Sequence, residues 1–301
     1  MRRDHPALPI LVTVLAIALF SVMDALMKRA AIASGVYSAM LLRSVMAGSV
    51  VAMIWRVRGW RMPPRAVMRL HALRGVVCAV MATTFFYGLV RTPMAEAMAL
   101  SFIAPLIALY LAAVLLGERI RREAIIAAVL GFAGVVVIVA ERIGGANLSG
   151  TAAQGEAAQG IAAILLSAVA YAWNLVLQRK QAQLATPTEV ATFQNLFVGL
   201  TLLPLTPWLW HTPPWAALPD IAAAAVLATA SIMLLSWAYA RAETQVLVPI
   251  EYTAFIWAAL MGWLWFDEGL SLGTVAGVVL IIAGCWLGTR GKPSEIALSA
   301  P

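Results

Sequence analysis

The sequence predicts an all-α polytopic membrane protein with ten transmembrane helices, arranged as two inverted five-helix repeats with both termini inside. Composition, the placement of Lys and Arg, and a similarity between the two halves carry this prediction. Hydrophobic residues make up 62% of the chain and charged residues 12%, against about 45–50% and about 25% in soluble globular proteins. The apolar runs are about 18 to 23 residues long, enough to cross a hydrocarbon core of about 30 Å as helix.

Hydropathy predicts where the spans lie, with Pro, Gly and charge clusters marking the breaks between them. The first run begins like a signal peptide, but it continues past the usual length of one and is interpreted as a retained span. In order, the predicted spans lie near residues 9–28, 37–55, 70–90, 94–116, 124–141, 160–178, 190–210, 217–240, 245–266 and 271–289.

The distribution of Lys and Arg predicts the orientation of the chain. With the N-terminus inside, the inner segments hold 15 of the 21 Lys and Arg residues and the outer loops hold 4. Short cytoplasmic loops of membrane proteins are enriched in these residues. Both termini are therefore expected in the cytoplasm, and the clustering beside spans argues against a nucleic-acid partner.

A shift of 150 residues aligns the two halves without gaps, so that Arg29 falls on Arg179, Arg91 on Arg241 and Glu118 on Glu268. The predicted units are residues 1–143, an extracytoplasmic flexible linker at 144–159, and residues 160–301. Because each repeat has an odd number of spans, the second enters the membrane from the opposite side. Inverted repeats of this kind build secondary transporters with a site near the midplane.

Three stretches resemble the EamA-type members of the drug/metabolite transporter superfamily. They are FSVMDALMKRA (20–30), SFIAPLIALYLAAVLLGERI (101–120) and VPIEYTAFIWAALMGWLWFDEGL (248–270). The resemblance implies ten helices with both termini inside and a central cavity lined by the first four helices of each repeat. It also implies transport of small organic metabolites, such as amino acids or vitamins, across a bacterial inner membrane, and it leaves substrate and direction open.

Ionisable residues inside spans cost about 2.5–3.5 kcal/mol each at the bilayer centre and are therefore candidate functional groups. Asp24 falls past the middle of the first span, and the 150-residue shift places it on Asn174, so both are expected to line the cavity. Lys28, one turn further on, is expected to extend toward the outer headgroups. Whether Asp24 meets substrate, a proton, Lys28 or Arg43 stays open.

Arg43 could hold a carboxylate or phosphate through its donor fork, or it could be the buried partner of Asp24. Arg74 is expected to extend toward the inner surface from its span end. Glu251 follows Pro249, where a helix can open toward a cavity, and it could there bind a proton reversibly. Glu268 is expected to cap a span end, with no partner evident.

Aromatic side chains beside these polar positions could stack on an organic solute. The candidates are Tyr87, Trp173 beside Asn174, and Tyr252 beside Glu251. Pro105 and Pro249 are the expected hinges, because proline interrupts the hydrogen bonding of a helix.

The sequence argues against an enzyme, a metal site and a cofactor. Its three histidines form no helical His/Asp cluster, no spaced Cys/His set and no Walker-type loop is present, and Cys78 and Cys285 are expected to be packing residues. The expected partners are a small solute, the lipid bilayer, and either a proton or a counter-substrate. The glycines of the fifth and tenth spans suit packing within one chain or contact in a homodimer. A non-transporting receptor or scaffold subunit is the alternative.

Overall fold

The fold is helical throughout the part of the chain that the computed structural model describes, and no strand occurs in that part. The structure describes residues 8–57, 62–104, 106–107, 122–144, 151–182, 184–239, 241, 247 and 250–289. The expected hinges Pro105 and Pro249 lie outside the described residues.

The first half of the chain contributes five described helices. Gly35, with a φ of +79°, forms the turn between the first two, where a residue without a Cβ adopts the left-handed conformation at little cost. Pro64 and Pro93 directly precede the third and fourth, at positions where the missing N–H breaks no helical hydrogen bond. The helices are α1 (Leu8–Ser34), α2 (Val36–Val57), α3 (Arg65–Leu89), α4 (Met94–Ser101) and α6 (Arg122–Gly144).

The second half contributes the remaining helices. Thr186 caps the second of them by accepting a hydrogen bond from the Glu189 N–H. Asp267, in the left-handed conformation, ends the helix that precedes the last. In order they are α7 (Thr151–Ala182), α8 (Pro187–Leu202), η1 (Leu203–Leu205), α9 (Thr206–Leu209), η2 (Trp215–Ala217), α10 (Leu218–Tyr239), α12 (Ala254–Phe266) and α13 (Leu272–Thr289).

Six described helices are long and apolar enough to span a membrane. Three shorter apolar helices accompany them, at Val129–Glu141, Ala254–Phe266 and Leu272–Gly284. The helix α7 begins at Thr151, inside the segment expected to be a flexible linker. The linker prediction is therefore wrong from residue 151 onward, because Ala, Gln and Glu between the glycines are strong helix formers.

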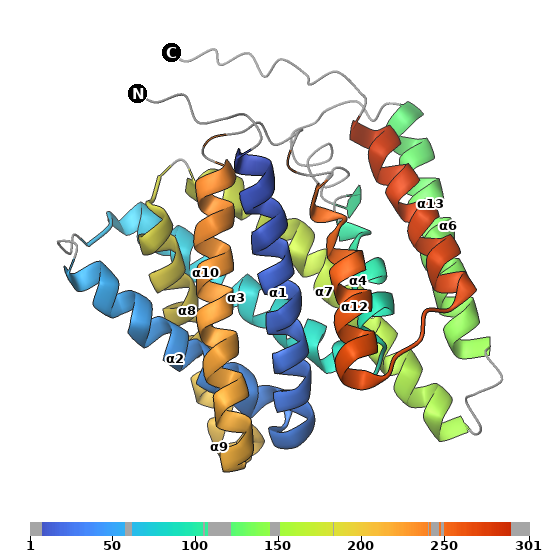
Figure 1. The fold of residues 1–301 in the computed structure, drawn as a ribbon. Coiled ribbons are helices and arrows are strands. Elements are labelled where there is room, and N and C mark those ends of the chain that lie inside the picture. The colour runs from blue at the N-terminus through green and yellow to red at the C-terminus, as the bar shows by residue number, and fades with distance from the viewer. Residues whose placement is uncertain are drawn as a thin grey trace.

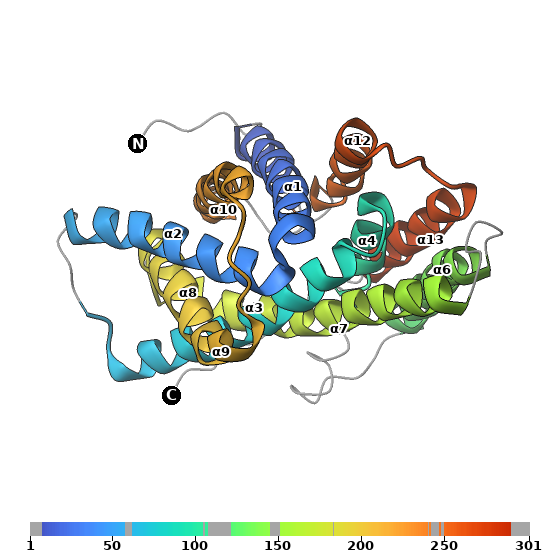
Figure 2. The same ribbon diagram turned by 90° about the horizontal axis from the view of Figure 1, so that it is seen from below.

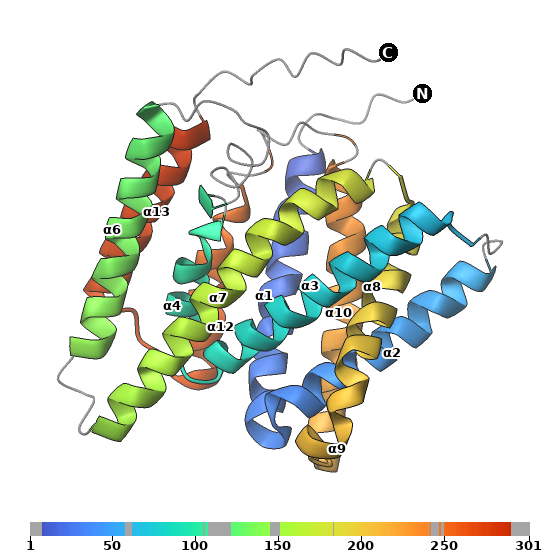
Figure 3. The same ribbon diagram turned by 180° about the vertical axis from the view of Figure 1, so that it is seen from behind.

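The helices pack as interleaved neighbours from the two halves of the chain. The helix α1 lies against α10 and α12, while α3 lies against α7 and α8. Figure 2, seen from below, shows α2 beside α8, and Figure 3, seen from behind, shows α3 and α7 running side by side. The two halves thus form one bundle instead of two separate bodies.

The pair α6 and α13 stands at one edge of this bundle (Figures 1 and 3). A Cβ built on Gly134 would lie 2.5 Å from the Gly277 carbonyl oxygen, and one on Gly277 would lie 2.7 Å from the Gly134 carbonyl oxygen. Only glycine permits such an approach of two helix backbones. These two glycines therefore serve packing within a single chain.

The helices run alternately up and down the bundle, so that α1 begins and α13 ends at the same end (Figure 1). At the opposite end lie the last turn of α1, the first turn of α10 and the last turn of α12. This end is called the closed end below, because ion pairs join these three helices there.

Candidate functional site

Asp24 is a buried carboxylate near the middle of the bundle, with 7% of its surface exposed. Among the described residues it makes no hydrogen bond and no ion pair within 4.0 Å. The charge that acts on it is that of Arg43 on α2. Asp24 is thus buried, and neither a pair with Lys28 nor a direct pair with Arg43 forms among the described residues. That it lines a cavity stays a prediction.

Arg43 is only partly satisfied by its surroundings. One Nη donates to the Met23 sulfur at 3.7 Å, and the guanidinium lies 5.9 Å from the centre of the Phe86 ring. Its Nε is buried without a hydrogen-bond partner among the described residues. Asp24 and Arg43 are thus opposite charges held near each other, each with capacity for a further polar partner.

Lys28 does not extend to the surface, so that prediction is wrong. Its side chain is 5% exposed and forms an ion pair with Glu268, which had no evident partner in the sequence. Its ammonium also donates to the Thr92 carbonyl oxygen at 2.8 Å and lies 4.8 Å from the centre of the Phe266 ring. A glutamate 240 positions away supplies the charge that keeps the lysine buried.

Three further hydrogen bonds lie at the closed end. The second Glu268 oxygen accepts from the Met94 N–H at 2.7 Å. Arg29 forms an ion pair with Asp220 at the start of α10, and its Nε donates to that carboxylate at 2.6 Å. These contacts join α1, the start of α4, α10 and the end of α12.

Arg74 is also buried, which contradicts the prediction that it extends toward the surface. Its Nε donates to the Asn174 carbonyl oxygen at 2.9 Å. Its two terminal nitrogens donate to Gln178 at 3.2 Å and to Gln181. Asn174 in addition accepts from the Cys78 thiol at 3.3 Å. The position of Arg74 near a span end suggested a surface role, but the polar face of α7 holds it inside.

A second polar pair continues this network toward the end where α8 begins. His71 on α3, fully buried, contacts Glu189 through Nε2 at 3.0 Å and Gln181 through Nδ1. Its ring stacks on Phe193 with centroids 4.9 Å apart. A chain of hydrogen bonds therefore runs from Glu189 through His71 and Gln181 to Arg74.

Glu251 and Tyr252 lie at an interruption of the helix that leads into α12. Residues 252 and 253 leave the helical pattern, and the N–H groups of Thr253 and Ile256 donate three residues back, at 3.0 and 2.9 Å. The same pattern interrupts the chain after α4, at residues 102 and 103. The Tyr252 ring packs edge-on against Phe102 with centroids 5.1 Å apart, so the two interruptions meet.

Tyr87 and Trp173 lie apart from this cluster. The Tyr87 hydroxyl donates to Gln159 at 3.2 Å, and Arg91 covers its ring at 3.6 Å. Trp173 is 42% exposed. Consecutive helical residues point about 100° apart, so the same turn of α7 that buries Asn174 directs Trp173 outward.

The sequence predicted a surface position for Arg74 and a packing role for Cys78, and it did not single out Gln181. Asn174, Gln178 and Gln181 recur at the spacing of one helix face, which in an apolar helix marks a buried polar stripe. That spacing was the available signal. Among the described residues no cluster of His, Cys, Asp or Glu is placed to hold a metal ion.

The comparisons with known proteins agree with a membrane transport protein. The profile of the EamA-like transporter family matches residues 7–140 and again residues 158–290. The pseudopaline exporter of Pseudomonas aeruginosa is 26% identical over 290 residues, covering 94% of this chain and 96% of the relative. The S-adenosylmethionine uptake transporter of Rickettsia prowazekii is 24% identical over 213 residues, covering 71% of this chain and 69% of the relative.

A solved crystal structure shares the fold, with a TM-score of 0.60 at 22% identity over 95% of this chain and 98% of the other. The family match covers both halves of the chain, and both relatives above are transporters. The chain is accordingly an integral membrane transport protein, not an enzyme, and it belongs to the EamA-like transporter family.

Proposed function

We propose that the protein is a secondary-active transporter that moves a small organic metabolite by alternating access between two inverted five-helix repeats. The proposal includes ten spans, a bacterial inner membrane location and both termini in the cytoplasm. The common end of α1 and α13 and the alternating helix directions support this arrangement (Figure 1).

The observation that carries the proposal is a symmetry in the packing. A shift of about 150 residues exchanges α1 with α7, α2 with α8, α3 with α10 and α6 with α13. Under this exchange the α1–α10 contact becomes the α7–α3 contact, and the α2–α10 contact becomes the α8–α3 contact. All four contacts occur in the structure. A structure whose halves exchange places in this way can expose one site to either side by a relative rotation of the halves.

The two helix interruptions are the positions at which the proposed rotation would take place. The interruption at residues 102–103 corresponds to that at 252–253, and Phe102 meets Tyr252 between them. Broken helices near the contact of two inverted repeats are typical of transporter substrate sites, because backbone groups become free to bind there. Pro105 and Pro249 stay proposed as the hinges.

The proposed transport site contains Asp24, Arg43 and Asn174 from the helices and Glu251 and Tyr252 from the second interruption. It excludes Tyr87 and Trp173, given where their side chains lie. Amino acids, vitamins and related solutes are the proposed substrate class. The names of the relatives, a pseudopaline exporter and an S-adenosylmethionine uptake transporter, make those two compounds natural members of a test panel.

Either a proton or a counter-substrate is proposed to drive transport, with Asp24 and Glu251 as the carboxylates that could carry the proton. The unit of transport is proposed to be the monomer, since Gly134 and Gly277 are engaged within one chain.

Uptake and efflux of a metabolite panel in proteoliposomes, with and without a pH gradient, test the proposal. We expect at least one solute to move, and Asp24→Asn with Glu251→Gln to change the pH dependence of its transport. A receptor or scaffold subunit would move none. It would also leave cysteines placed at 24, 174 and 251 unreactive toward water-soluble thiol reagents.

A further inference from the structure

We propose that Arg74 binds an oxyanion group of the transported solute, a carboxylate or a phosphate. The inference rests on the proposed transport function and adds a substrate class to it. The guanidinium lies between α3 and α7, which run side by side (Figure 3).

Arg74 lacks a counter-ion among the described residues, although it is 5% exposed. Its hydrogen-bond acceptors are the neutral amide oxygens of Asn174, Gln178 and Gln181. An arginine always carries its charge, and a buried charge is costly unless an opposite charge compensates it. The amides satisfy three donors and leave the positive charge uncompensated.

Two other cations of the bundle each have a carboxylate partner. Lys28 is compensated by Glu268 and Arg29 by Asp220. The carboxylate closest along the network, Glu189, is engaged by His71. Unlike Lys28 and Arg29, Arg74 has no carboxylate within ion-pair distance among the described residues.

The repeat shows that a carboxylate is compatible with this place in the fold. Asn174 corresponds to Asp24 under the 150-residue shift. The Asn174 amide oxygen lies 2.9 Å from the Arg74 Nε. An aspartate at 174 would therefore place a negative charge next to that nitrogen. The chain instead has the isosteric amide there, which leaves the guanidinium charge without a counter-ion at this position.

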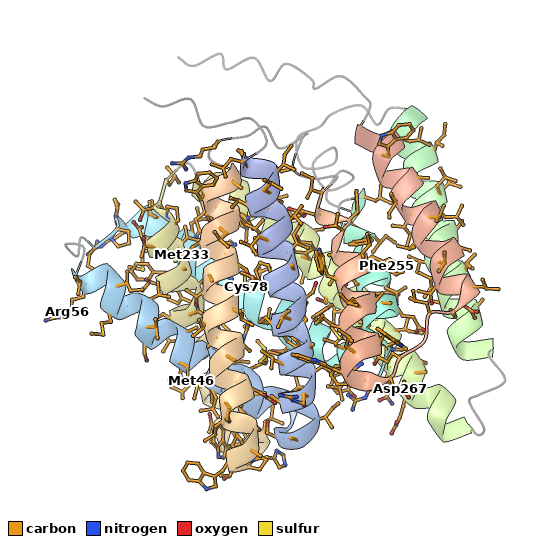
Figure 4. All side chains as sticks on the ribbon, viewed as in Figure 1. Met46, Arg56, Cys78, Met233, Phe255 and Asp267 are labelled. Atoms are coloured by element: carbon orange, nitrogen blue, oxygen red, sulfur yellow. The ribbon has the colours of Figure 1, made fainter. Side chains whose placement is uncertain are left out.

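A second cation lies on the same side of the site. Cys78, one turn along α3 from Arg74 and in the middle of the bundle (Figure 4), lies within the electrostatic reach of both Arg74 and Arg43. Two guanidinium groups thus lie near one thiol in the region where the solute is proposed to bind, and the charge of Asp24 acts on one of them, Arg43. Guanidinium donors match the oxygens of carboxylates and phosphates in geometry and charge.

Transport of matched solutes in proteoliposomes tests the inference. Amino acids are compared with their carboxamides, and nucleoside monophosphates with their nucleosides. We expect every transported solute to carry an oxyanion, and removal of that group to lower kcat/KM at least tenfold. Discrimination in the first set identifies a carboxylate, and discrimination in the second identifies a phosphate; both support Arg74 as the anion-binding group.

Asn174→Asp separates substrate binding from a structural role. This variant supplies an internal counter-ion, so we expect it to lose the preference for the oxyanion solute while its apparent Tm stays unchanged or rises. Arg241→Gln removes an arginine at the end of α10 and should keep the preference. Preference retained in Asn174→Asp, or equal transport of the two members of both matched sets by the natural protein, would overturn the inference alone. No transport of any solute would overturn the proposed function as well.

Discussion

The buried ion pair at the closed end gives the sharpest prediction of stability. Glu268→Gln preserves the shape of the side chain and an oxygen that accepts from the Met94 N–H, but it removes the charge that compensates Lys28. Breaking a buried pair from one side costs about 3–5 kcal/mol. Because the Glu268 side chain is 17% exposed and the Gln oxygen still accepts hydrogen bonds, we expect about 2–3 kcal/mol here.

The matched control is Asp220→Asn, which breaks the neighbouring pair with Arg29. The Arg29 side chain is 55% exposed, and exposed pairs contribute only about 0.2–1 kcal/mol. Unfolding in mixed detergent and SDS micelles, followed by tryptophan fluorescence, measures both costs under the same conditions.

A double-mutant cycle with Lys28→Met isolates the pair itself. We expect an interaction energy of about 2 kcal/mol, because removal of both charges leaves neither one buried alone. Equal costs for Glu268→Gln and Asp220→Asn, or an interaction energy near zero, would refute the reasoning from burial.

Three further predictions concern packing and the limits of the site. Gly134→Ala should destabilise the α6–α13 pair by about 1–3 kcal/mol, since the new methyl meets a backbone carbonyl, whereas Gly155→Ala, with open space around its Cβ, should be neutral or stabilising by up to about 1 kcal/mol; the same micelle titration reads both. Tyr37→Phe should cost about 1 kcal/mol in that titration, because the hydroxyl donates at 2.7 Å to a carbonyl oxygen at the end of α8, and a cost near zero would remove this bond from the account. Trp173→Leu should leave the KM of transport within about twofold, while Asn174→Leu should raise KM or abolish transport by leaving the Arg74 Nε unpaired, and equal effects would contradict the outward placement of Trp173.

Much of the helical architecture follows from the sequence, because apolar runs of membrane length leave few alternatives. The burial of Asp24 was also predictable, since the 150-residue shift pairs it with Asn174. Side chains near span ends were harder to place. Lys28 and Arg74 were both expected at the surface, because a long cationic side chain can reach it from a span end.

Lys28 and Arg74 are held inside the bundle by their polar partners. In both cases these partners come from the other half of the chain. Glu268 and the polar face of α7 reach these cations only after the two halves interleave. A local rule for span ends contains no information about such contacts. The helical spacing of 174, 178 and 181 was the exception, because it is visible within one segment.

The position of Gln181 between Arg74 and His71 has a consequence for hydrogen placement. Arg74 has only donors, so the Gln181 oxygen must face it and the Gln181 amino group must face His71 Nδ1. The imidazole is then the tautomer with its hydrogen on Nε2, directed at Glu189. A proton added to Nδ1 would require the amide to turn and present its amino group to the guanidinium. Imidazolium formation at His71 and the Gln181 bond to Arg74 therefore exclude each other.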